Sequence, residues 1–116
     1  MGSMITVTAA DGGRFQAYCA QPARGSGPGI VLLQEIFGVN RHIKAVADYY
    51  AEEGYVVLAP DIFWRIEPGV DLGYGGADME KALSLLQRFD ASRAVDDIKA
   101  TVAALRALPA CTGKVG

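Results

Sequence analysis

The chain has 116 residues, of which 51% are hydrophobic and 21% are charged, a size and composition typical of one compact domain and not of a disordered chain. Its formal net charge is −2 and its 11 lysine and arginine residues are scattered, so neither a nucleic acid nor an anionic membrane is the expected partner. Its apolar runs are too short to span a bilayer and no signal peptide is recognised, so we expect a cytoplasmic protein.

The first residues predict an antiparallel hairpin. Met1 to Ser3 stand before a second methionine and are interpreted as an expression scar, so the domain is expected to cover residues 4–116. Two β-prone runs follow, at Ile5 to Thr8 and at Phe15 to Ala20, joined by AADGGR. Asp-Gly-Gly is a strong turn signal, which favours pairing of these two runs.

The next segments predict a parallel pair of strands. After the loop QPARGSGPG, Ile30 to Leu33 is continuously apolar, as in a strand covered on both faces. Asn40 can cap a helix with apolar residues at helical spacing, and Tyr55 to Ala59 is the next β-prone run. A strand, a helix and a strand within about 30 residues form a βαβ unit with a right-handed crossover.

The second half of the chain predicts a long loop and two helices. Phe63 to Gly76 is rich in glycine, proline and aromatic residues without a clear period, which favours an active-site or binding loop, with a merely structural excursion as the alternative. Helices are predicted at Asp78 to Arg88 and from about Ser92 to Leu108. The final TGKVG resembles the start of another strand, so the domain is expected to be truncated with an open sheet edge.

These elements together predict an α/β fold. Antiparallel strands come first, followed by the parallel βαβ unit, with helices on both faces of the sheet. No linker or internal repeat marks a second domain.

Three residues that could carry nucleophilic or metal chemistry are interpreted as ordinary residues. Cys19 and Cys111 form no C-x-x-C pair and are expected to be free, buried thiols. Cys111 lacks the glycine two residues earlier that a nucleophile turn requires, so it is expected to be an ordinary loop cysteine. His42 is the only histidine and is expected to be solvated in the first turn of its helix. No metal site and no cofactor are therefore predicted.

A carboxylate stands where the first parallel strand ends. Gln34 and Glu35 directly follow the apolar run. A carboxylate that leaves the interior of a sheet must be solvated, paired or functional, because an isolated buried charge is very unfavourable. The residues alone leave these three alternatives open.

Four segments carry a resemblance to a known family. LLQEIFGVN, GYVVLAPDIF, RFDASRAVDDI and GKVG resemble, in order and spacing, the amino-terminal half of the dienelactone hydrolases, a branch of the α/β-hydrolase fold. In that family the GKVG strand continues into a G-x-C-x-G nucleophile elbow, and the triad follows the order Cys, Asp, His. All three triad positions would lie beyond Gly116. The resemblance implies a carboxymethylenebutenolidase-like hydrolase of esters or lactones, with the 116-residue chain inert by itself.

The resemblance also implies roles for residues of this chain. Glu35 would lie beside the nucleophile, pair with an arginine of the carboxyl-terminal half and control formation of the thiolate. Ile36 would contribute its backbone N–H to the oxyanion hole. Phe37 would form a wall of the acyl pocket, with a core position beneath the next helix as the alternative.

One family position differs in this sequence. The arginine that binds a substrate carboxylate in dienelactone hydrolases corresponds to Met79, which argues against dienelactone itself as the substrate. Arg65 and Lys81 are cations that could compensate by binding substrate, with plain surface charges as the alternative.

Two hypotheses follow. In the first, the chain is part of an ester or lactone hydrolase for a small-molecule substrate, and the missing carboxyl-terminal half or a second chain covers the open sheet edge. In the second, it is a non-enzymatic α/β module that assembles through that edge. We favour the first, because a natural module would be expected to protect such an edge.

Overall fold

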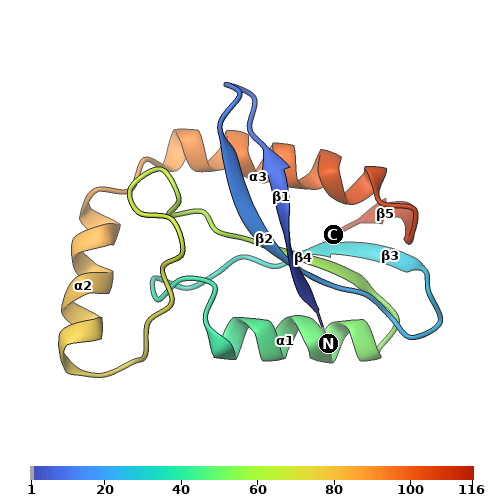
Figure 1. The fold of residues 1–116 in the computed structure, drawn as a ribbon, viewed down its shortest axis with the longest axis horizontal. Coiled ribbons are helices and arrows are strands. Elements are labelled where there is room, and N and C mark those ends of the chain that lie inside the picture. Colours follow the sequence, from blue (N-terminus) through green and yellow to red (C-terminus); the bar gives the residue numbers. More distant parts are fainter. Residues whose placement is uncertain (1) are drawn as a thin grey trace.

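Five strands form one mixed sheet in the computed structural model, which describes residues 2–116 (Figure 1). The strand order across the sheet is β1-β2-β4-β3-β5. Along the chain the elements are β1 (Ser3–Thr8), β2 (Arg14–Ala20), β3 (Gly27–Val31), α1 (Arg41–Glu52), β4 (Val56–Pro60), α2 (Gly76–Gln87), α3 (Ala91–Ala107) and β5 (Cys111–Val115).

The strand pairing confirms the predicted α/β fold. β1 pairs antiparallel with β2, and β2 pairs antiparallel with β4. β3 and β4 are parallel, with Ile30 opposite Val57, and α1 connects them as the crossover helix. The remaining helices begin and end within two residues of their predicted limits.

The central strand β3 starts earlier than the apolar run indicates. The segment Gly27–Gly29 was predicted to be a loop, but it belongs to β3, and the strand ends at Val31. A Cβ atom on Gly29 would lie 2.7 Å from the Leu105 side chain of α3. Glycine here lets the helix pack closely on the strand, so tertiary packing overrides the local loop signal.

The edge of β3 is covered by β5. The two strands are parallel, with Gly27 opposite Cys111 and Gly29 opposite Val115, and the Val31 N–H donates a hydrogen bond of 2.9 Å to the Gly116 carbonyl. The expectation that Cys111 lies in a loop was therefore wrong, whereas the expected start of a strand at TGKVG is confirmed. Within residues 2–116 the two outer strands of the sheet are β1 and the largely exposed β5.

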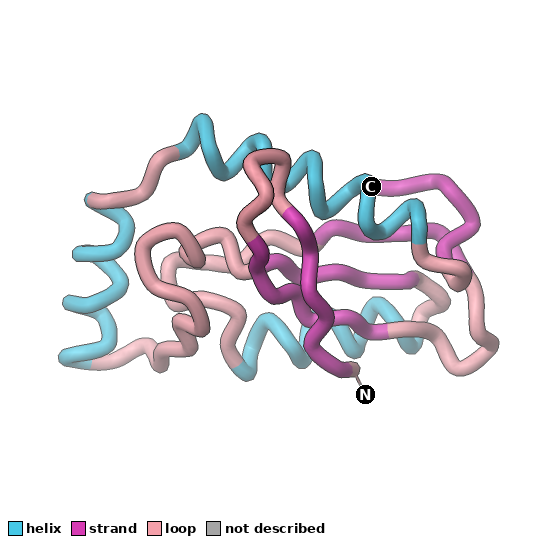
Figure 2. Tube along the Cα trace, turned by 45° about the horizontal axis from the view of Figure 1, so that its top comes forward, coloured by secondary structure: helices cyan, strands magenta, loops and turns pink. Residues whose placement is uncertain are grey.

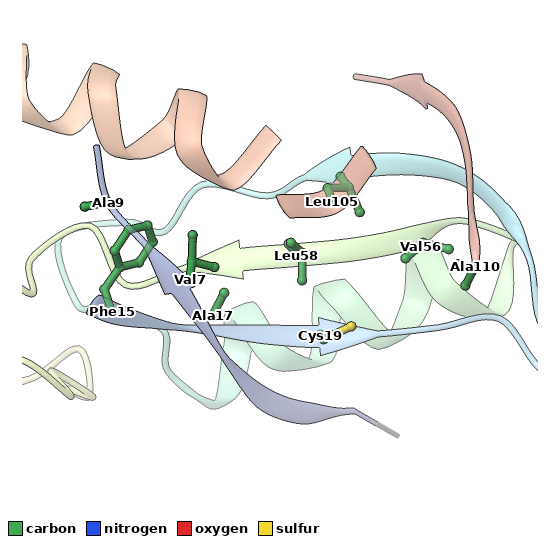
Figure 3. Close-up of a cluster of buried hydrophobic side chains, with 9 residues drawn as sticks. All are labelled: Val7, Ala9, Phe15, Ala17, Cys19, Val56, Leu58, Leu105 and Ala110. Carbon is green, nitrogen blue, oxygen red and sulfur yellow. The ribbon is translucent and has the colours of Figure 1, made fainter. Parts of the chain in front are cut away.

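Helices cover both faces of the sheet, as predicted (Figure 2). On one face α1 buries Ile43, Ala47 and Ala51 against β2 and β4. On the other face α3 buries Leu105 in a cluster that also contains Leu58 and Phe15 (Figure 3). These two buried layers hold the parallel strands β3 and β4 in place.

The third helix lies outside this sandwich. Figure 1 shows α2 beyond the carboxyl ends of the parallel strands, at the left of the view. Its buried residues are Ala82 and Leu85, and Leu85 packs with Phe63 and Val70 of the loop that follows β4. No helix among residues 2–116 is long and apolar enough to cross a membrane.

Candidate functional site

The segments that follow β3 and β4 meet at the carboxyl end of the parallel strands. The Gln34 side chain joins them: its Oε1 accepts a hydrogen bond of 3.0 Å from the Ile62 N–H, and its Nε2 donates one of 2.9 Å to the Glu35 carbonyl. Open α/β sheets bind ligands at this end of their strands. Glu35 thus lies at the edge of the sheet where a carboxylate could meet a bound ligand.

A tight turn carries the chain from Glu35 into α1. The Gly38 N–H donates to the Glu35 carbonyl at 3.2 Å, and Gly38 has a φ of +86°. A Cβ atom on Gly38 would collide with the Val70 carbonyl. The Leu72 N–H also donates to the Phe37 carbonyl at 2.9 Å, so the loop after β4 fixes this turn from outside.

One side chain binds the Glu35 carboxylate, and a second holds that side chain in place. The Tyr74 hydroxyl donates to Glu35 Oε1 at 3.1 Å, and Asn40 Nδ2 donates to the Tyr74 hydroxyl at 3.3 Å and to the Leu72 carbonyl at 3.0 Å. Asn40 is buried, and its Oδ1 accepts the Ile43 N–H at 3.1 Å as the cap of α1. Glu35 is exposed but has a defined donor, so it is paired as well as solvated.

Tyr74 is the site residue that the sequence did not indicate. Its ring meets that of Phe37 edge-on with centroids 4.4 Å apart, and that of His42 with centroids 6.4 Å apart. Phe37 is buried under this loop, whereas His42 is exposed as predicted. The rings of Phe37 and His42 are thus both neighbours of the Tyr74 ring.

A small cavity of about 210 Å³ adjoins Glu35. The residues that line it are Gln34, Glu35, Ile36, Ile62, Phe63, Leu86 and Phe89. The structure therefore brings Glu35 and Ile36 together, while Phe37 and Arg65 do not line this cavity. Within residues 2–116 no acceptor takes the Ile36 N–H.

Arg65 lies in an adjoining cavity of about 400 Å³ and is already paired. Its guanidinium donates to Asp97 at 2.9 and 3.0 Å and to Asp11 at 2.7 Å, and it stacks 4.4 Å from the Trp64 ring centre. The hydrogen bonds that Arg65 donates to Asp97 and Asp11 raise the pKa of its guanidinium. Lys81 is also paired, with Glu67 at 2.7 Å.

Asp61 organises the loop that follows β4. Its buried carboxylate accepts the Gly69 N–H at 2.8 Å and the Phe63 N–H at 3.2 Å. Burial raises the pKa of Asp61, and these two hydrogen bonds oppose the rise. The carboxylate thereby closes the first half of the loop that supplies Tyr74.

Neither cysteine is placed beside Glu35. Both are free thiols, as predicted, but Cys111 is only partly buried and not buried as expected. Cys19 is buried in β2, and burial raises the pKa of its thiol. Cys111 begins β5, at the opposite end of that strand from the site. Among residues 2–116, no hydrogen bond joins His42 to a cysteine or serine, and no three histidine, cysteine or acidic side chains are grouped as a metal site requires.

Comparison with known proteins gives a consistent result. The model of the dienelactone hydrolase family matches residues 15–116. The chain is 38% identical over 112 residues to a carboxymethylenebutenolidase from a Pseudomonas species, and the aligned region covers 96% of this chain and 47% of that protein. It is 35% identical over 113 residues to the carboxymethylenebutenolidase of Pseudomonas putida, with coverages of 97% and 48%.

The fold has close counterparts among solved structures. The crystal structure of a dienelactone hydrolase candidate from Klebsiella pneumoniae superposes with a TM-score of 0.78 at 23% identity, covering 99% of this chain and 47% of that one. A dienelactone hydrolase-like promiscuous phosphotriesterase from metagenomic libraries superposes with a TM-score of 0.69 at 24% identity, with coverages of 98% and 47%. The chain spans about half the length of the curated relatives it matches.

Proposed function

Because the chain belongs to the dienelactone hydrolase family, we propose that it is part of a hydrolase that cleaves small carboxylic esters or lactones. One observation carries this proposal. Glu35 and Ile36, whose N–H has no acceptor among residues 2–116, both line one small cavity at the carboxyl end of the parallel strands. That combination of an acid–base group and an oxyanion donor is what acyl transfer requires.

The role proposed for Ile36 is half of an oxyanion hole. A nucleophile that adds to an ester carbonyl turns the carbonyl oxygen into an oxyanion, which backbone N–H groups can stabilise. In α/β-hydrolases one such donor comes from the loop after the third strand and the other follows the nucleophile. Ile36 lies in the loop after β3 and has an N–H without an internal acceptor, so it matches the first of these donors.

The role proposed for Glu35 is control of a cysteine nucleophile. A carboxylate beside a thiol can accept its proton or, by charge repulsion, keep the thiol protonated. Tyr74 and Asn40 would hold Glu35 in place through the hydrogen bonds described above. We propose that the nucleophile, the histidine and the acid come from a carboxyl-terminal half such as the relatives contain, and that the 116-residue chain alone is inert.

For Arg65 we propose a structural role before a role in substrate binding. Binding of a substrate carboxylate by this guanidinium would require it to leave the carboxylates of Asp97 and Asp11 or to share them. We therefore assign it first to the support of the loop after β4. The position corresponding to the family arginine carries Met79, which agrees with a substrate other than dienelactone.

The experiment compares the 116-residue chain with the complete hydrolase, meaning this chain together with a carboxyl-terminal half. Both are assayed with 4-nitrophenyl acetate, and circular dichroism checks that each is folded. We expect turnover only from the complete hydrolase. Glu35→Gln should lower its turnover without loss of fold, whereas Glu52→Gln, an exposed position at the end of α1, should not.

Two results would contradict the proposal. Turnover by the 116-residue chain that disappears on substitution of Cys111 or His42 would place the chemistry within this chain. Equal turnover of the complete hydrolase with and without Glu35→Gln would reduce Glu35 to a structural residue.

A further inference from the structure

Asn40 is buried at the start of α1, and a single side chain, Tyr74, connects its amide with Glu35. Resting on the function proposed above, we propose that Asn40 is a positioning residue of the hydrolase, which directs the hydroxyl proton of Tyr74 onto the Glu35 carboxylate. This role depends on which group donates and which accepts at each step from the backbone to Glu35.

Two backbone groups fix the orientation of the Asn40 amide. Its Oδ1 accepts the Ile43 N–H at 3.1 Å, and its Nδ2 donates to the Leu72 carbonyl at 3.0 Å. A backbone N–H can only donate and a backbone carbonyl can only accept, so a flipped amide would lose both bonds. Asn40 is only 3% exposed, and an unmade bond in such a buried place is unfavourable.

The fixed amide decides the direction of the Tyr74 hydroxyl. Asn40 Nδ2 donates its second proton to the Tyr74 oxygen at 3.3 Å, and an amide nitrogen does not accept a hydrogen bond in return. The single hydroxyl proton of Tyr74 is thus left for Glu35 Oε1, 3.1 Å away. Oε1 is therefore an acceptor in this arrangement, and the proton of a thiol would go to Oε2.

The bond from Tyr74 leaves room for the partners that a carboxyl-terminal half would bring. A carboxylate has about four lone-pair sites on its two oxygens, and the Tyr74 hydroxyl uses one of those on Oε1. Oε2 remains for the nucleophile and for the arginine that the family resemblance implies at Glu35. All the groups that direct the Tyr74 proton, from the Ile43 N–H outward, belong to this chain.

The loop after β4 is fastened within reach of the amide. Leu72 is bound on both sides, because its N–H donates to the Phe37 carbonyl at 2.9 Å while its carbonyl accepts from the amide. The Gly73 N–H donates to Asp78 Oδ2 at 2.8 Å, in the first turn of α2. Tyr74 is itself 50% exposed, so hydrogen bonds rather than burial keep its hydroxyl in place.

A helix cap alone is the ordinary role of an asparagine at this position, and two substitutions separate that role from the proposed one. Asparagine, aspartate and serine cap helices about equally well, so Asn40→Asp and Asn40→Ser both keep an acceptor for the Ile43 N–H. Neither keeps the amide donor to the Tyr74 oxygen. Asn40→Asp also introduces an acceptor, to which the Tyr74 hydroxyl can donate in place of Glu35.

The experiment measures kcat and KM of the complete hydrolase with 4-nitrophenyl acetate at pH 8, well above the ordinary carboxyl range near about 4. We expect Asn40→Asp to lower kcat roughly fivefold, as the loss of one hydrogen bond does, and Asn40→Ser to lower it about twofold. KM should be unchanged in both. Urea denaturation checks that each variant is folded, and Asn40→Ser carries the same test without a buried charge if Asn40→Asp does not fold.

A double-mutant cycle tests whether Asn40 acts through Tyr74. In the Tyr74→Phe background neither substitution at position 40 should lower kcat further, because the hydroxyl that Asn40 directs is already absent. Asp90→Asn is the matched control, since it makes the converse exchange at the cap of α3 and should leave kcat unchanged.

A crystal structure of the Asn40→Asp hydrolase gives a readout that requires no activity. In the wild type the Tyr74 oxygen lies closer to Glu35 Oε1, at 3.1 Å, than to Asn40 Nδ2, at 3.3 Å. We expect this order to reverse in the variant and Glu35 Oε1 to move out of hydrogen-bond distance, because the hydroxyl has only one proton for two acceptors.

The outcomes separate this inference from the function on which it rests. Absence of turnover by the wild-type complete hydrolase would contradict the hydrolase function, and the crystal structure would then decide whether Asn40 directs the proton. A Tyr74 hydroxyl that stays on Glu35 in Asn40→Asp would overturn the inference. Wild-type kinetics in both variants, or losses of kcat that persist in the Tyr74→Phe background, would also overturn it and keep the function.

Discussion

Asp97 and Arg65 form a two-point ion pair that ties α3 to the loop after β4. Arg65 Nε donates to Asp97 Oδ2 at 3.0 Å, and Nη2 donates to Oδ1 at 2.9 Å. Asp97 is only 1% exposed and also accepts the Trp64 indole N–H at 2.9 Å. The loop that supplies Ile62 and Phe63 to the cavity is thus fixed at a helix that does not itself reach Glu35.

Removing this carboxylate should destabilise the protein. Asp97→Ala leaves the Arg65 guanidinium and the Trp64 N–H without their buried acceptor, for which we expect a loss of about 3 kcal/mol in the free energy of unfolding. Arg65 retains 22% exposure, so we take the lower end of the range. Urea denaturation measures the change. The neighbouring exposed Asp96→Ala should cost less than about 0.5 kcal/mol, and equal effects at the two positions would contradict the prediction.

Loss of the Tyr74 hydroxyl should affect kcat rather than KM. Tyr74→Phe preserves the ring contact with Phe37 but removes the donor to Glu35. One hydrogen bond contributes about 1 kcal/mol, so we expect roughly a fivefold lower kcat in the complete hydrolase with KM unchanged. Tyr49→Phe, at an exposed tyrosine of α1, is the control. A Tyr74→Phe enzyme with the kinetics of the wild type would show that the hydroxyl does not position Glu35.

Gly38 should tolerate no side chain. Gly38→Ala would both strain a residue with a φ of +86° and drive its Cβ into the Val70 carbonyl. Gly12 separates these effects, because its φ is +90° and no atom lies within 4 Å of the added Cβ. We expect Gly12→Ala to cost about 1–2 kcal/mol and Gly38→Ala clearly more, by urea denaturation. Similar costs would mean that the turn can move away from Val70.

The buried carboxylate of Asp61 predicts a dependence of stability on pH. Burial raises its pKa above the ordinary 3.8, so the folded state binds the proton more tightly than the unfolded state. Its contribution is fully present below pH 3.8 and is lost as pH rises through the raised pKa. The unfolding free energy of the wild type minus that of Asp61→Asn should therefore fall from acid to neutral pH. A difference that increases with pH would show that the bonds from Gly69 and Phe63 dominate.

The two thiols should react at different rates. Cys19 is 6% exposed and burial raises its pKa, which disfavours the reactive thiolate. Cys111 is partly exposed. We expect iodoacetamide to label Cys111 at least about tenfold faster than Cys19, measured by mass spectrometry of tryptic peptides. Faster labelling of Cys19 would indicate that β2 opens readily from the sheet.

The sequence predicted the parts of the fold that local patterns determine. The apolar runs at Ile30 to Leu33 and Tyr55 to Ala59 marked the parallel strands because a strand covered on both faces must be apolar throughout. It mispredicted Gly27–Gly29 because a glycine at position 29 is required by the approach of Leu105, 76 positions later, and one at position 27 by the approach of the Gly54 carbonyl. Such a constraint has no local signal.

The candidate site was predictable to a similar extent. The position of Glu35 at the end of a strand follows from the chain itself, whereas its donor Tyr74 lies 39 residues away in a loop without periodicity. The partners of Arg65 were also hidden, because Asp11 and Asp97 come from a hairpin turn and from α3. Contacts between distant segments decide which polar residues are free to bind a ligand.

The Gln34 side chain ties together the loop after β3 and the loop after β4. One amide connects the turn that holds Glu35 with the Ile62 backbone, 28 residues further along, and both belong to the cavity wall. These segments therefore lose their conformational entropy when the chain folds and not when a small molecule binds. Preorganisation of this kind leaves more of the contact energy for affinity, because binding need not immobilise the wall that it touches.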